Sequence, residues 1–158
     1  MSKLLKRLCL VLAAVLLLCP LAERRASAAS ALSAEEQTLI SLVNEDRARY
    51  GLSALTVDPA LCEVARIKAQ DMLGNGYFAH TSPTYGNIRQ MLTSFGVSYR
   101  GASENIARSR SVYHAEAAFL SSSTGHRQTL LGSQWTRVGV GVAVTRAGFV
   151  YVSQVFAR

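Results

Sequence analysis

The feature that most constrains the fold of this chain is an alternating stretch over residues 138–144, which reads VGVGVAV. Successive side chains of a strand point to opposite faces, so one face of this strand is branched and the other is nearly bare. A bare face lets a helix or another backbone approach closely. A turn is expected at residues 145–148. Residues 149–156 are then apolar on both faces, as in a central strand that is covered on each side.

Two long helices are predicted in the first half of the chain. Ser33 and Glu36 have the capping-box spacing and open a helix that we expect to end near residue 50. Asp58-Pro59 combines a good N-cap with the residue best suited to the first helical position, and residues 74–76 (GNG) end that second helix. One face of the second helix is formed by Leu61, Val64, Ala65, Lys68 and Met72.

Two shorter helices are predicted before the strands. Apolar residues recur at helical spacing over about residues 88–95 and again over residues 111–122. With helices first and an antiparallel hairpin last, the sequence predicts an α+β protein built in layers.

Residues 1–28 predict a signal peptide. A basic start is followed by an apolar run of 12 residues, 8–19, and by the small residues of Ala26-Ser27-Ala28, which signal peptidase accepts. The run is short for a bilayer span, which needs about 20 residues. Arg24 and Arg25, close to the cleavage point, leave an uncleaved anchor as the alternative. We therefore expect a secreted, extracytoplasmic protein in which residues 29–158 form a single domain.

Charge and cysteine content limit the partners. The net charge of +7 falls to +3 for residues 29–158, because the leader carries five basic residues and one acid. The remaining basic residues are scattered singly, so no nucleic-acid partner is expected. Attraction to a wall polymer or to lipid headgroups stays open, and with it peripheral association. Cys62 is the one cysteine beyond the leader, so no internal disulfide is expected, and we predict a buried, inert thiol. A monomer is expected.

Six motifs occur in a fixed order over residues 42–156. They are LVNEDRARYGLSAL, FAHTSP, SENIA, SSTGHRQTLL, VGVGVA and YVSQVF. In this order they resemble the bacterial members of the CAP superfamily, the group of cysteine-rich secretory, antigen 5 and pathogenesis-related proteins. The resemblance covers nearly all of the chain beyond the leader. It implies an α-β-α sandwich with a central antiparallel sheet covered by helices on both faces.

The resemblance also implies a central cleft that holds two histidines and two acidic residues, often with a divalent metal on the histidines. Carried over motif by motif, His80, Glu104 and His126 match these positions, and Ser103 stands where the family usually has glycine. His80 and His126 are therefore the expected metal ligands. Zinc is a suitable ion because neutral imidazoles bind it well.

The second acid is predicted from helical geometry. Glu116 lies four residues after Val112 and three before Phe119, so it shares their apolar stripe. His114 is two residues away and points to another face, so we predict that it is a surface residue. The predicted ligand cleft consists of His80, Glu104, Glu116 and His126.

Three functions are compatible with this cleft. The first is a non-enzymatic binding module for a lipid, peptide or cell-wall ligand, which the resemblance favours because CAP domains are chiefly associated with extracellular binding. The second is a metal-dependent hydrolase of peptide or peptidoglycan bonds, in which one of Glu104 and Glu116 completes the metal site and the other acts as base. The third is a structural envelope or spore component. A serine nucleophile is disfavoured, because residues 121–123 are sequence neighbours of His126 and no G-x-S-x-G motif occurs.

Overall fold

The computed structural model describes residues 31–158, and the predicted signal peptide, residues 1–28, lies outside them. All four predicted helices are present, and the predicted hairpin closes the chain. The helices are α2 (Ala34–Arg49), α3 (Pro59–Gly74), α4 (Ile88–Ser94), α5 (Val112–Ser121) and α6 (His126–Leu130). The strands are β1 (Thr56–Val57), β2 (Ala102–Ser109), β3 (Arg137–Val144) and β4 (Val150–Ala157).

The helix starts follow the predicted capping chemistry. The Ser33 hydroxyl accepts from the Glu36 backbone N–H at 3.2 Å, and the Glu36 carboxylate accepts from the Ser33 N–H at 2.9 Å. At α3 the Asp58 carboxylate accepts from the Ala60 N–H at 2.9 Å. These local pairs satisfy N–H groups that no helical carbonyl can reach, which explains why both starts were predictable from the sequence.

The sheet has the strand order β1-β3-β4-β2. Neighbouring strands are antiparallel except for the two-residue β1, which pairs with β3 in parallel. The predicted central strand is β4, and every one of its residues is buried. Its outer neighbour β2 contains the SENIA motif, which the sequence analysis did not assign to a strand.

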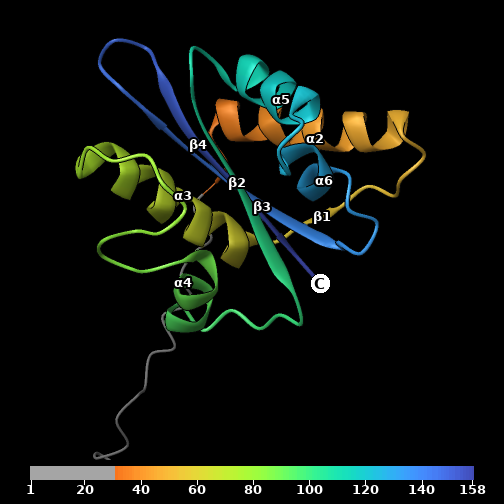
Figure 1. The fold of residues 1–158 in the computed structure, drawn as a ribbon, viewed down its shortest axis with the longest axis horizontal. Helices are drawn as coiled ribbons and strands as arrows, with labels where there is room; N and C mark the ends of the chain where they lie inside the picture. Colours follow the sequence, from red (N-terminus) through yellow and green to blue (C-terminus); the bar gives the residue numbers. More distant parts are fainter. Residues whose placement is uncertain (1–30) are drawn as a thin grey trace, which may run out of the picture.

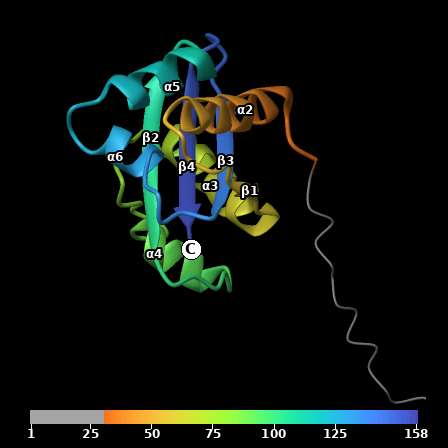
Figure 2. The same ribbon diagram turned by 90° about the vertical axis from the view of Figure 1, so that its right-hand side faces the viewer.

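Helices cover both faces of the sheet, so the predicted α-β-α sandwich is confirmed. Figure 2 shows α2 in front of the strands and α3 behind them, with β2 at one edge. The valine face of β3 joins the core beneath α2 and α5. The bare face lies directly against α3, since a Cβ added at Gly139 would stand 2.2 Å from the Leu61 backbone and one at Gly141 2.2 Å from that of Ala65.

Cys62 lies in α3 and is buried, as predicted. Burial raises the pKa of its thiol and keeps it in the unreactive protonated form. Among residues 31–158 no helix is long and apolar enough to cross a bilayer.

Candidate functional site

The site begins with a contact between His80 and Glu104. His80 lies in the connection between α3 and α4, and its Nδ1 is 3.0 Å from Oε2 of Glu104 on β2. The Glu104 side chain is only 2% exposed, and its second oxygen accepts from the Ser153 hydroxyl on β4 at 3.2 Å. The imidazole itself is 58% exposed. A buried, doubly bonded carboxylate therefore fixes an exposed ring by Nδ1 and leaves Nε2 available.

Helix α3 holds the loop that carries His80. The Lys68 ammonium is fully buried and donates to the backbone carbonyls of Ala79 at 2.7 Å and His80 at 2.9 Å. Burial lowers its pKa. One turn later, Asp71 accepts from the hydroxyls of Ser82 at 2.6 Å and of Tyr77.

Sequence reasoning missed the role of Lys68 and Asp71. The sequence did contain a signal for Lys68, because a lysine on the apolar face of a helix must be buried with a partner that compensates its charge.

His126 approaches from the other side of β2. It is the first residue of α6 and follows Gly125, whose φ of 102° places the turn in a region that glycine tolerates best. The rings of His126 and His80 have centroids 6.5 Å apart. Nδ1 of His126 is 3.2 Å from the Ser122 hydroxyl, and the ring packs on Phe119. Burial, with His80 beside it, lowers the pKa of His126.

Glu116 is buried, and His114 is exposed, as predicted. The Glu116 carboxylate accepts from the Gln154 side-chain amide. The Gln154 carbonyl oxygen in turn accepts from Asn105 Nδ2 at 3.3 Å, and the same Nδ2 donates to the His126 backbone carbonyl at 3.1 Å. Asn105 and Glu104 are adjacent on β2, so their side chains point to opposite faces.

The structure thus brings His80, Glu104 and His126 together at the β2 edge. Glu116 lies on the α5 side of the sheet and is linked to His126 through the side chains of Gln154 and Asn105. Its Oε1 has no hydrogen-bond partner in the described part of the chain. Burial, reinforced by Asp46 and opposed by the Gln154 hydrogen bond, raises the pKa of Glu116 to about 8.

Comparison with known proteins identifies the family. The model of the cysteine-rich secretory protein family, CAP, matches residues 40–156. The chain belongs to the CAP family. Among curated proteins, YkwD of Bacillus subtilis (strain 168) is 38% identical over 132 residues, which is 84% of this chain and 51% of YkwD. This CAP chain therefore spans about half the length of that relative.

Solved structures agree with this assignment. An extracellular protein containing a SCP domain from Bacillus anthracis str. Ames is 35% identical, with a TM-score of 0.70 over 78% of this CAP chain and 40% of that one. An outer surface protein of Borrelia burgdorferi is 21% identical, with a TM-score of 0.72 over 78% of this chain and 92% of that one. The second likeness concerns the fold alone.

The donor set of the CAP site suits a metal held by two imidazoles. Neither Nε2 of His80 nor Nε2 of His126 has a hydrogen-bond partner among residues 31–158. Two imidazoles on one tetrahedral zinc ion have ring centroids roughly 5 to 5.5 Å apart, given Zn–N bonds of about 2.1 Å. The observed separation is 6.5 Å, so the two rings would have to move together to share an ion. No group of three His, Cys, Asp or Glu side chains able to hold a metal occurs in the described residues.

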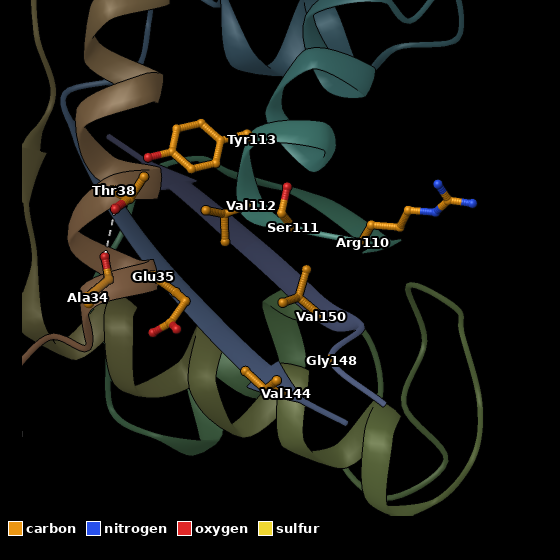
Figure 3. A pocket seen from close by; sticks show the side chains of 10 residues that line it. All are labelled: Ala34, Glu35, Thr38, Arg110, Ser111, Val112, Tyr113, Val144, Gly148 and Val150. Carbon is orange, nitrogen blue, oxygen red and sulfur yellow. Dashed lines mark hydrogen bonds between the residues drawn. The ribbon is translucent and has the colours of Figure 1, made fainter. Parts of the chain in front are cut away.

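A separate hollow lies on the α2 side of the CAP fold. Figure 3 shows it between the starts of α2 and α5 and the turn that joins β3 to β4. Its volume is about 330 Å³. Its lining includes Thr38, Val112, Tyr113, Val144 and Val150, together with the charged side chains of Glu35 and Arg110. Its walls are thus mostly apolar, and its size falls within the range of small-molecule pockets.

Proposed function

We propose that this chain is an exported, non-enzymatic CAP module that binds its ligand at the β2 edge through His80 and His126. The observation that carries the proposal is the state of the two rings: each has Nδ1 beside a side-chain oxygen and Nε2 without a partner among residues 31–158. A carboxylate or hydroxyl on one ring nitrogen fixes the tautomer and orientation that let the other act as a ligand.

A divalent ion such as zinc would be held by these two Nε2 atoms. Glu104 would orient His80 without binding the ion, because its oxygens already contact Nδ1 of His80 and the Ser153 hydroxyl. The lowered pKa of His126 keeps that ring neutral, as metal binding requires. The ion would supply a positive centre that attracts an anionic or carbonyl group of a peptide or cell-wall ligand.

The proposed location is outside the cytoplasm. In this proposal residues 1–28 are removed as a signal peptide and residues 29–158 act as one domain. Support comes from the Bacillus anthracis protein with a SCP domain, which is 35% identical and described as extracellular. The net charge of +3 on residues 29–158 would allow peripheral contact with an anionic wall or membrane surface.

Zinc titration by calorimetry tests the metal site. We expect one ion per chain, and we expect His80→Ala and His126→Ala each to weaken binding at least about tenfold, or about 1.4 kcal/mol. His114→Ala is the matched control, since the chain has three histidines and this one is exposed and contacts Ser111. An equal loss in His114→Ala, or unchanged affinity in both site variants, would contradict the proposal.

The hydrolase alternative needs a carboxylate that is free to act as base. Both Glu104 oxygens are engaged, and Glu116 contacts Gln154 on the opposite face of the sheet. This arrangement favours binding over hydrolysis. Turnover of peptide or peptidoglycan that disappears in a folded Glu104→Gln variant would reverse that preference.

An apolar ligand would have a second place to bind. The hollow of Figure 3, between α2 and α5, has mostly apolar walls and enough volume for a small apolar chain. Mass spectrometry of solvent extracts from the purified protein checks for such a molecule. A purified protein with no bound lipid, no affinity for cell-wall material and no metal binding would count against the binding module as a whole and favour a structural envelope role.

A further inference from the structure

Three arginines line one hollow. It lies at the end of the sheet where the chain finishes after β4, which Figure 1 marks with the letter C. The hollow has a volume of about 280 Å³, and its lining consists of Ser98, Tyr99, Arg100, Arg137 and Arg158. These residues come from the connection before β2, the start of β3 and the end of β4. Local sequence periodicity gives no hint of this cluster because its members are far apart along the chain.

Backbone contacts fix the cluster. The Arg100 N–H donates to the Arg158 carbonyl at 2.6 Å, and the Arg158 N–H donates to the Gly101 carbonyl at 3.0 Å. A Cβ added at Gly101 would stand 2.9 Å from Nε of Arg158, so the Arg158 side chain lies across this glycine. Arg137 is held by the Asp58 carboxylate and donates to the Ser98 carbonyl at 2.9 Å.

The side-chain charges of the hollow are not balanced, and the backbone carboxylate of Arg158 accepts from the Arg100 N–H. Asp58 pairs with Arg137, whereas Arg100 and Arg158 form no ion pair within residues 31–158. No acidic residue lines the hollow, and none occurs in the sequence from 72 to 103. Two guanidinium groups therefore remain available to an external anion.

A second hollow lies against α4. The second hollow has a volume of about 530 Å³, and its lining shares Tyr99 with the first and adds Arg89. Asn87 and Gln90 also line it, and their carbonyl oxygens accept each other's backbone N–H groups in the capping box. Their NH₂ groups donate to no group among residues 31–158. Tyr99 lines both hollows, and the path past it from Arg158 to Arg89 presents cations and hydrogen-bond donors.

We propose that this path binds the phosphodiester backbone of an anionic polymer that carries no nucleobases. A guanidinium group forms bidentate hydrogen bonds with two oxygens of a phosphate. A polymer with a phosphate in every repeat can therefore contact several of these arginines at once. The site is separate from the two histidines, and the proposal does not rest on metal binding.

Binding of synthetic poly(glycerol phosphate) to the full chain tests the proposal by calorimetry. The double variant Arg100→Glu with Arg158→Glu should weaken binding at least about tenfold. It should also make the slope of log affinity against log salt shallower by about 1 to 2, because fewer phosphate contacts release fewer counterions on binding. The control is Arg146→Glu, an exposed arginine in the turn between β3 and β4. It should bind as the parent does.

A charge-neutral variant separates geometry from charge. Gly101→Ala keeps every arginine but displaces the Arg158 side chain, so affinity should fall several-fold while folding is kept. His80→Ala should leave polymer binding unchanged.

Five results would overturn the proposal. Two concern the polymer itself: no binding at millimolar phosphate, or an equal loss of affinity in Arg146→Glu. The other three are equal affinity for polyglutamate, equal affinity for single-stranded DNA, and binding to phosphatidylglycerol vesicles without binding to the soluble polymer. Equal affinity for polyglutamate would reduce the effect to charge alone, equal affinity for DNA would make the occupant a nucleic acid, and vesicle binding alone would make it a membrane.

Discussion

At the scale of single residues, the burial and hydrogen bonding of Glu116 determine the protonation state of its carboxyl group. Its side chain has one hydrogen bond, from Gln154, and one oxygen without a partner in the described part of the chain. A carboxylate in that position is costly when ionised, which is why burial raises its pKa to about 8. The residue is therefore protonated at neutral pH in the folded state and ionised in the unfolded state.

Replacing Glu116 by glutamine should remove a pH-dependent loss of stability. The folded pKa of about 8 exceeds the ordinary value of 4.5, so the wild-type protein has its full stability below about pH 4.5 and loses it as pH rises toward 8. Glu116→Gln does not ionise, so the two proteins should be similar at pH 4.5. At pH 8.5 the variant should be more stable by a few kcal/mol, because a tenfold difference in proton affinity corresponds to about 1.4 kcal/mol. Urea unfolding at both pH values measures this, and a constant difference across pH would contradict it.

At the scale of elements, the contact between α3 and β3 holds the site loop in place. The glycines of β3 let α3 lie directly on the sheet, and Lys68 and Asp71 of that helix bind the loop that carries His80. The position of His80 therefore depends on how closely a helix and a strand approach, although neither glycine touches the histidine.

A methyl group at this contact should be strongly destabilising. In Gly139→Ala the new Cβ would meet the backbone atoms of Leu61 and Cys62 at 2.2 and 2.3 Å, and backbone cannot move aside as a side chain can. We expect a loss of about 3 kcal/mol or more in the free energy of unfolding, measured by urea titration. Gly74→Ala is the control, because nothing lies within 4 Å of its added Cβ. It should be neutral or stabilising by up to about 1 kcal/mol, and equal effects in both variants would refute the packing argument.

At the scale of the whole molecule, β4 joins the two helical layers. Its Val152 and Phe156 belong to the core beneath α2 and α5, while Val155 and Ala157 belong to the core beneath α3 and α4. Neither layer keeps its apolar face covered if the sheet opens, so the two cores should be lost together.

Unfolding should therefore be a single cooperative transition. Trp135 is the one tryptophan of the chain; its indole donates to the Thr129 carbonyl at 2.9 Å, and it packs against the α2/α5 core. Its fluorescence reports that layer, whereas far-UV circular dichroism reports all helices. We expect the two urea transitions to coincide. Separate midpoints would mean that the layers unfold independently and that residues 29–158 do not act as one domain.

Local chemistry made much of this protein predictable from its sequence. Helix starts at Ser33 and Asp58 depend on atoms within three residues, and the alternation of 138–144 dictates a strand with one bare face. The inward position of Glu116 followed from helical spacing alone. The resemblance to the CAP family implied that His80, Glu104 and His126 share one site, and the structure brings these three together.

Only the tertiary structure decided which partners the remaining side chains meet. The sequence places Glu116 inward but not on which side of the sheet, so its pairing with Gln154 rather than with the histidines depended on how α5 packs. The burial of Lys68 beneath the His80 loop and the meeting of Arg100, Arg137 and Arg158 have the same origin. Spacing along a chain defines which face a residue occupies, whereas contacts between distant segments are set by the packing of whole helices and strands.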